Sequence, residues 1–286
     1  MIPAPFEYQA ASSLDDAIER LRLHGRDAKL LAGGQSLLPL MRLRIARPAI
    51  LIDIGRVEDL SFIREEADRI NIGPLTRHSD LARSPVLRAR CPILPYAASL
   101  IGDPQVRHRG TIGGALGHAD PASDLAAVLV ALGAEVLVRG AGSERAVPIS
   151  GLFADRFRTT LGPDEIIAAI GVPAMGSPDA WSYERAAVRP QGTLVAVAVV
   201  LRGANGRSGD VAISLANMGP APLRARSAER MILEGGLTVI PEAAEASSEG
   251  TAPISDADAS ADYRRHLAAV LTRRALLRAA SRLPAR

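Results

Sequence analysis

Two glycine-rich stretches contain the residues whose types and spacing best suit binding chemistry. The longer stretch runs from Arg109 to Asp124 and places four glycines, at positions 110, 113, 114 and 117, between Thr111 and Ser123. The shorter stretch is Ala32-Gly-Gly-Gln-Ser36. Glycine allows turns at positive φ and lets another molecule approach the backbone without meeting a Cβ atom. Because amides at a helix start or in a nest bind anions, we predict that both loops hold the pyrophosphate of a dinucleotide.

Neither loop has the spacing of the commoner nucleotide-binding motifs. The glycines of the longer loop do not follow the Rossmann Gly-x-Gly-x-x-Gly pattern, and neither loop ends in the Gly-Lys-Ser/Thr of a P-loop. These differences disfavour a nucleoside triphosphatase and an ordinary NAD-dependent dehydrogenase. One such loop alone is weak evidence, because tight turns often have this composition. Two loops that each follow an apolar segment and enter a helix are stronger evidence.

Other side chains give no recognisable catalytic or metal centre. The five histidines lack His-x-x-x-His spacing, although His108 and His118 flank the glycine loop and are candidates for ligand contact. Asp120 and Asp124 are four residues apart across a helix start, where Asp124 is either a helix cap or an acceptor for a ligand hydroxyl. Neither aspartate has the neighbouring ligands of a Mg²⁺ site. We assign no catalytic residue in the strict sense and no metal ligand.

The composition indicates a globular protein of two domains that does not bind nucleic acid. A chain of 286 residues is long for a single core, and its 48% hydrophobic and 23% charged residues are ordinary for a soluble protein. Only 3% of the residues are aromatic, which disfavours a stacking surface for single strands. The net charge of +3 is carried almost wholly by arginine and forms no clustered stripe.

Cysteine content and hydropathy favour a cytoplasmic location. The single cysteine, Cys91, cannot build a disulfide framework, a four-cysteine zinc site or an iron–sulfur cluster, and it fits a reducing compartment. The first residues lack the basic segment and apolar core of a secretory signal. The longest clear apolar run, 194–201, is too short to span a bilayer, so we expect no membrane span.

Periodicity divides the chain into two domains. We predict a first domain over 1–175, with subdomains of about 1–56 and 57–175, and a C-terminal domain over 180–286 after a Pro/Gly/Ser-rich linker. Residues 1–56 are expected to form a β-α-β-loop-α-β unit, with Ser12 or Ser13 capping the first helix and Ser36 the second. In 57–175 we expect a short helix capped by Thr76 or Ser79, and a helix over 125–132 capped by Asp124.

In the C-terminal domain the runs 181–187, 194–201 and 211–216 are predicted strands, and 227–233 a short helix. Residues 242–262 lack periodicity and indicate a mobile connection with a weak helix. A long basic helix over 263–282 is expected to direct four residues towards its apolar side: Leu267, Val270, Leu271 and Leu277.

Seven motifs, taken together, resemble a known family. They are Ala32-Gly-Gly-Gln-Ser-Leu-Leu-Pro-Leu-Met41, Ile72-Gly-Pro-Leu-Thr76, Gly102-Asp-Pro-Gln-Val-Arg107, Gly110-Thr-Ile-Gly-Gly114, Asp120-Pro-Ala-Ser-Asp124, Asn217-Met-Gly-Pro-Ala-Pro-Leu-Arg224 and Tyr263-Arg-Arg-His-Leu267. The sequence is similar over nearly its whole length to the FAD-binding medium subunit of molybdenum hydroxylases, the carbon-monoxide dehydrogenase and xanthine dehydrogenase family.

This resemblance implies an α+β fold, in which a two-subdomain FAD-binding domain of the PCMH or vanillyl-alcohol-oxidase type precedes a smaller α/β domain. It implies that the first loop wraps the FAD pyrophosphate, that the second loop meets it from the other subdomain, and that other positions contact the ribityl chain, adenine or isoalloxazine. The implied FAD-binding residues are Leu30, Leu31, Ala32, Gly33, Gly34, Gln35, Ser36, Thr111, Gly113, Gly114, His118, Ser123, Asp124 and Leu161.

The resemblance also implies partners. An iron–sulfur subunit would pass electrons to the FAD, a molybdopterin subunit would hydroxylate the substrate, and the complex would be a dimer of heterotrimers. FAD would then deliver the electrons to an external acceptor such as a quinone, O₂ or NAD⁺. Two alternatives stay open: a self-contained FAD-dependent oxidoreductase acting on a small molecule, and a non-redox nucleotide-binding or scaffold protein.

Two departures from the family pattern affect these expectations. Many relatives have Asn where this chain has Ala115, which removes one side-chain hydrogen bond to FAD. Many have an Asp and an aromatic ring covering the flavin where this chain has Gly192 and Thr193. The outer face of the flavin is therefore expected to be more open or differently covered.

Overall fold

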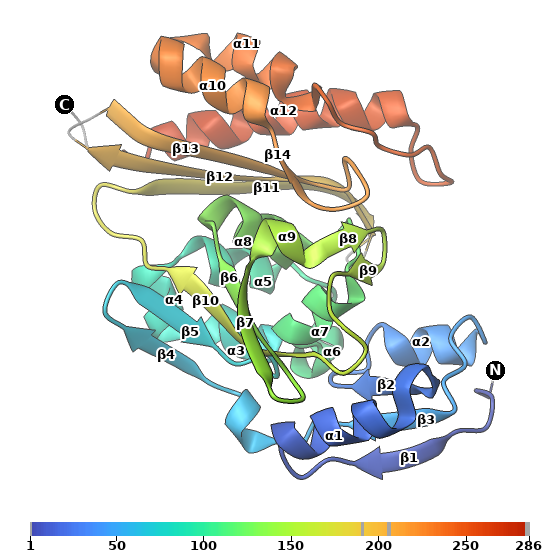
Figure 1. Cartoon of the computed structure of the whole chain (residues 1–286). Helices are drawn as coiled ribbons and strands as arrows, with labels where there is room; N and C mark the ends of the chain where they lie inside the picture. Colours follow the sequence, from blue (N-terminus) through green and yellow to red (C-terminus); the bar gives the residue numbers. More distant parts are fainter. Residues whose placement is uncertain (1, 190–191, 205–206, 284–286) are drawn as a thin grey trace.

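The computed structural model describes residues 2–189, 192–204 and 207–283, and it stacks a C-terminal sheet and its helices on a two-part N-terminal region (Figure 1). The first part is a three-stranded parallel sheet of order β1-β3-β2 with two helices. Its elements are β1 (Glu7–Ala10), α1 (Leu14–His24), β2 (Ala28–Leu31), α2 (Leu37–Arg42) and β3 (Ile50–Asp53). The predicted β-α-β-loop-α-β order is confirmed, and Ser13 caps α1 by accepting from the Asp16 amide at 3.0 Å.

The second part is a five-stranded antiparallel sheet of order β4-β5-β10-β6-β7 covered by short helices. Its strands are β4 (Ile63–Glu66), β5 (Arg69–Ile72), β6 (Glu135–Gly140), β7 (Ser143–Pro148) and β10 (Ile166–Pro173), with a small pair β8 (Phe153–Asp155) and β9 (Arg158–Thr159). Its helices are α3 (His78–Arg83), α4 (Pro85–Arg90), α5 (Ile93–Ser99), α6 (Pro104–Arg109), α7 (Ile112–His118), α8 (Asp124–Leu132) and α9 (Ile149–Leu152).

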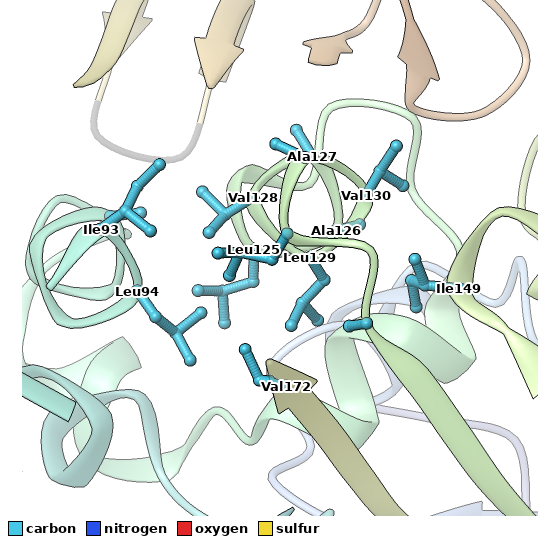
Figure 2. Close-up of a cluster of buried hydrophobic side chains, with 14 of the residues drawn as sticks. Ile93, Leu94, Leu125, Ala126, Ala127, Val128, Leu129, Val130, Ile149 and Val172 are labelled. Carbon is cyan, nitrogen blue, oxygen red and sulfur yellow. The ribbon is translucent and has the colours of Figure 1, made fainter. Parts of the chain in front are cut away.

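Helix α8 is the centre of the largest core. Every residue of α8 is buried, as expected for a helix that is apolar on all sides. Its side chains face α5 through Ile93 and Leu94, α9 through Ile149, and β10 through Val172 (Figure 2). The same core includes residues of the C-terminal sheet, so the two parts of the chain share buried apolar surface.

The C-terminal sheet has order β11-β12-β13-β14 and lies between α8 and the last helices. Its strands are β11 (Ala180–Arg189), β12 (Gly192–Ala204), β13 (Arg207–Ala216) and β14 (Leu223–Arg224), followed by α10 (Arg226–Gly235), α11 (Ile240–Glu245) and α12 (Ala261–Ala280). In β12, Ala196 and Ala198 belong to the core of α8, whereas Val197 and Val199 pack with α10 to α12. Since both faces are covered, residues 194–201 of β12 are continuously apolar, with alanines on the side of α8.

Several predicted helix details are wrong. Helix α3 begins after Arg77, and neither Thr76 nor Ser79 caps it. Ser123, rather than Asp124, caps α8, accepting from the Ala126 amide at 3.4 Å. Ser36 occupies the cap position of α2, but its side chain makes no cap hydrogen bond. These positions differ by one residue or by a side-chain rotamer, which sequence patterns do not determine.

The apolar side predicted for the last helix is also partly wrong. Leu277 is 52% exposed, whereas alanines and Leu271 face the sheet. Leucine periodicity misplaces this face because small alanines make most of the close contacts. Residues 240–245 form α11, and a turn of 3-10 helix follows at Ala246–Ser248, so the segment expected to be largely irregular is partly helical. Among the described residues, no helix combines the length and apolarity needed to cross a membrane.

Arg264 holds the irregular segment before α12 against the sheet. Its guanidinium is 1% exposed and donates to the Leu194 carbonyl at 2.6 Å, to the Ile254 carbonyl at 3.1 Å and to Asp256 at 2.6 Å. A buried arginine is tolerated when its donors are paired in this way. The contacts connect β12, the segment before α12, and α12 itself.

We expect Arg264→Ala to lower the free energy of unfolding by about 1–3 kcal/mol, because it leaves the buried Leu194 carbonyl without its donor, while Asp256 is exposed enough to be solvated. The neighbouring Arg265→Ala is the control, since Arg265 forms an exposed ion pair with Asp262 and should change stability by less than about 1 kcal/mol. Urea unfolding of both variants measures the difference, and equal stabilities would contradict this role.

Candidate functional site

The two glycine loops, 76 positions apart at Gly33 and Arg109, are in direct contact. The first follows β2 and leads into α2, and the second joins α6 to α7. A Cβ atom placed on Gly33 would lie 2.2 Å from the Arg109 carbonyl oxygen and 2.9 Å from the Gly110 Cα. Both distances are too short for any side chain, so only glycine at position 33 allows this contact. The structure therefore brings the two predicted parts of the cradle together.

The first loop presents a row of unpaired backbone amides. No hydrogen-bond partner is found, anywhere in the described part of the chain, for the amides of Gly33, Gly34, Gln35 and Ser36. Gly34 has φ 75°, and its carbonyl accepts from the Leu38 amide at 3.1 Å, which turns the chain into α2. Consecutive free amides in a turn form an anion-binding nest. This row fits the diphosphate of FAD.

The amides at the start of α7 are not free to bind the diphosphate, contrary to the prediction for the second loop. The first amides of α7 already have partners: Ile112 donates to Thr76 at 3.1 Å, Gly113 to Pro74 at 2.8 Å and Gly114 to the Thr111 hydroxyl at 3.1 Å. These bonds fix α7 against the loop before α3. What α7 offers is a surface without side chains, because Gly114 and Gly117 are exposed. A Cβ placed on Gly117 would meet no atom within 4 Å.

The remaining predicted residues lie at different distances from this contact. Leu31 packs beside Gly34, since a Cβ on Gly34 would lie 3.3 Å from a methyl group of Leu31. Leu30 packs into the core of the first part, and Leu161 packs against the core around α8. His118, at the end of α7, is half-buried with its ring 5.2 Å from that of Phe157.

Asp124 lies in a buried polar cluster that the sequence did not reveal. The carboxylate is 7% exposed; Oδ1 accepts from the Tyr183 hydroxyl and, at 3.1 Å, from the Thr193 hydroxyl, and Oδ2 is 3.6 Å from the Arg185 guanidinium. Burial raises the pKa of Asp124, opposed chiefly by Arg185. Tyr183, Arg185 and Thr193 belong to β11 and β12. Tyr183 and Arg185 were missed because they are distant in sequence and have no local motif, and Thr193 was expected near the flavin rather than at Asp124.

The same C-terminal strands hold the loop between α7 and α8. The Pro121 carbonyl accepts from the Asn217 amide at 2.7 Å, and the Asn217 side chain donates to the Thr193 carbonyl at 3.0 Å. Thr193 is 5% exposed and directed at Asp124. Since the Thr193 side chain is buried in the polar cluster, it does not cover the outer face of the flavin as the aromatic ring of many relatives does.

His78 forms the support beneath the second loop. A Cβ on Gly110 would lie 2.7 Å from the imidazole Cδ2, and the His78 amide donates to the Gly110 carbonyl at 3.0 Å. The side chain is buried, and its Nδ1 has no hydrogen-bond partner within the described residues. Burial, with Arg107 and Arg77 nearby, lowers the pKa of His78 to about 4. The imidazole is therefore neutral at pH 7, which suits a ring packed on glycine.

We expect the contribution of His78 to the free energy of unfolding to be lost in acid. The unfolded chain, with an ordinary histidine pKa of about 6.5, binds the proton more readily than the folded chain. This contribution to stability is complete above about pH 6.5 and is lost as the pH falls towards 4. Between pH 8 and pH 5 the wild type should lose roughly 2 kcal/mol more than His78→Gln. Urea unfolding at both pH values measures this, and parallel losses would contradict it.

We expect Asp124→Ala to destabilise the contact between α8 and the C-terminal sheet by about 1–3 kcal/mol, because Tyr183 and Thr193 lose their acceptor. Thr193→Val removes one of these donors without removing the carboxylate and is the matched variant. Urea unfolding and FAD titration should be measured together. Weaker FAD binding in Asp124→Ala alone indicates a direct contact, whereas unchanged affinity removes Asp124 from the set of FAD ligands.

Comparisons with known proteins agree over the whole chain. A family model for the FAD binding domain in molybdopterin dehydrogenase matches residues 4–175, and one for the CO dehydrogenase flavoprotein C-terminal domain matches residues 184–279. The carbon monoxide dehydrogenase medium chain of Hydrogenophaga pseudoflava is 40% identical, over 96% of this chain and 97% of that protein. The nicotine 6-hydroxylase medium subunit of Paenarthrobacter nicotinovorans is 37% identical, over 98% and 99%.

Solved structures confirm the predicted fold class. A chain of a Cu,Mo-CO dehydrogenase in its cyanide-inactivated form superposes with a TM-score of 0.95 at 35% identity, covering 99% of this chain and 100% of that one. A chain of quinoline 2-oxidoreductase from Pseudomonas putida 86 has a TM-score of 0.92 at 30% identity, covering 98% and 99%. The chain therefore belongs to the FAD-binding medium subunits of the carbon monoxide dehydrogenase and molybdenum hydroxylase family of oxidoreductases.

Proposed function

We propose that this chain carries electrons within a molybdenum-dependent hydroxylase: it receives them from an iron–sulfur partner subunit and releases them to an external acceptor. The observation that supports this most directly is the row of free amides at 33–36, held against the second loop by Gly33. Relatives named as medium chains or subunits of carbon monoxide, nicotine and glyceraldehyde enzymes support membership of a larger complex. FAD, when bound, supplies acceptance and release of two electrons.

The chain's own residues bind and orient the cofactor. The amides of Gly33 to Ser36 would donate to the diphosphate. Thr111 accepts from the Gly114 amide, and the exposed glycines of α7 leave room for the cofactor. We propose all the FAD-binding residues that the family resemblance implies; the contacts described above support Leu161 and Asp124 least. No cluster of histidine, cysteine or acidic residues suited to a metal is found among the described residues.

The proposed assembly follows from the same family. An iron–sulfur subunit and a molybdopterin subunit would complete a heterotrimer that pairs into a dimer of heterotrimers, in the cytoplasm.

The domain bounds 1–175 and 180–286, with a division near residue 56, are proposed for this chain. The amides of residues 174 and 175, at the end of the first domain, donate to the Asp68 and Arg90 carbonyls at 2.7 and 2.6 Å, which fixes the start of the linker.

We expect Gly114→Val to lose bound flavin, because the added side chain stands on the exposed face of α7 where the cofactor would lie. Its Cβ would also lie 2.7 Å from Thr111 Oγ1, so Gly117→Val, on the same face with no atom within 4 Å, should lose flavin without that contact. Gly151→Val is the matched control: position 151 is also helical and exposed, and a Cβ there would meet only Val147 at 3.7 Å. Flavin absorbance per protein and circular dichroism measure the outcome.

Full flavin absorbance in Gly114→Val would contradict the assignment of the second loop. Reduction of the wild-type flavin by a small molecule, without added subunits, would instead favour the self-contained oxidoreductase.

A further inference from the structure

We propose that the side chain of Phe157 covers the isoalloxazine ring of the bound FAD; this inference rests on the proposed function. Phe157 lies in the turn between β8 and β9, beside the end of α7 (Figure 1). Its side chain is 52% exposed, and none of the apolar cores of the described residues includes it. The phenyl ring therefore contributes to no core and has a face open to a planar ligand.

The backbone holds Phe157 in an uncommon conformation. Its φ is 57°, in the left-handed region, where a bulky side chain is an outlier. The Phe157 amide donates at 2.9 Å to the carbonyl of Ala119, which ends α7 with a φ of 53°. Strain of this kind persists only where the surrounding structure enforces it, and it is concentrated at ligand-binding sites. The hydrogen bond fixes the turn, and with it the ring, to the end of α7.

The ring stands at one end of the glycine face of α7. Gly117 and His118 come three and four positions after Gly114, so these three residues share one side of the helix. Gly114 and Gly117 are exposed. The His118 ring lies 5.2 Å from the Phe157 ring, centroid to centroid, and their planes are inclined at 41°. A ligand that lies along the two glycines reaches this aromatic pair next.

The polarity of the two ends of the site favours the flavin end of FAD at Phe157. The start of α7 adjoins the first loop, since a Cβ on Gly114 would lie 3.9 Å from the Cβ of Ala32, and the diphosphate would lie there. Beyond Gly117 the chain supplies polar side chains at His118 and Asp120, whereas residues 30–32 before the first loop are apolar. The ribityl chain carries hydroxyl groups that need polar partners. We therefore assign the ribityl chain to the end of α7 and the isoalloxazine to Phe157.

Phe157 provides this cover from the FAD-binding domain. In the C-terminal domain, Thr193 is directed at Asp124 instead. Two stacked aromatic systems gain more than the apolar area that they bury, and the phenyl ring would exclude water from one face of the flavin. Phe157 is accordingly a positioning residue for the isoalloxazine and makes no contact with the diphosphate.

The test uses the full chain, freed of flavin and titrated separately with FAD and with ADP, which shares the diphosphate and the adenine. We expect Phe157→Gly to raise the Kd for FAD about tenfold and to leave the Kd for ADP unchanged. Glycine accepts a φ of 57°, so this variant should fold normally. Phe157→Trp should bind FAD and quench the flavin fluorescence, because a stacked indole quenches the excited isoalloxazine.

Phe6→Gly is the matched control. Phe6 is a 40% exposed phenylalanine that precedes β1, the strand of the first sheet farthest from β2 and the first loop. It should bind FAD and ADP as the wild type does.

The outcomes separate the two proposals. An unchanged Kd for FAD in Phe157→Gly, or unquenched flavin in Phe157→Trp, would overturn the assignment of Phe157 alone. Equal losses of FAD and ADP affinity in Phe157→Gly would place the ring at the adenine end or give it a structural role, and would also overturn it. A wild-type chain that binds neither FAD nor ADP would contradict the proposed function itself.

Discussion

The structure depends on one backbone contact, in which Gly33 lies against the Arg109 carbonyl and the Gly110 Cα. Each of the two loops alone is an ordinary turn. Their contact brings the free amides of the first loop close to the exposed glycines of α7, so that backbone from two subdomains lies on one surface. A side chain at position 33 would separate the loops. Binding of an extended anionic cofactor therefore depends on how closely the subdomains pack.

The C-terminal domain keeps the second loop in position from the other side. Strand β12 supplies Thr193 and a carbonyl for Asn217, and these residues hold the start of α8 and the loop before it. Helix α8 is apolar on all sides and is buried between this sheet and the five-stranded one. The FAD-binding and C-terminal domains consequently share a core. The buried Asp124 and its partners add polar contacts to a largely apolar interface.

Local residue patterns predicted most of the elements and both loops, because short-range capping, turns and apolar periodicity determine them. Ser13 caps α1 as expected, and the glycine loops were identified by composition alone. The Asp124 cluster could not be predicted, since Tyr183 and Thr193 are 59 and 69 residues away and meet it only through tertiary packing. The amides of α7 were wrongly expected to be free because their partners, Thr76 and Pro74, come from another loop.

The most direct test is a crystal structure of the chain with FAD bound. We expect diphosphate oxygens to accept hydrogen bonds from the amides of Gly33 to Ser36, and the cofactor to lie on the exposed face of α7 at Gly114 and Gly117. The Gly33 contact with Arg109 should be unchanged. A diphosphate bound elsewhere, or two loops that separate when the cofactor binds, would contradict the claim that this contact creates the site.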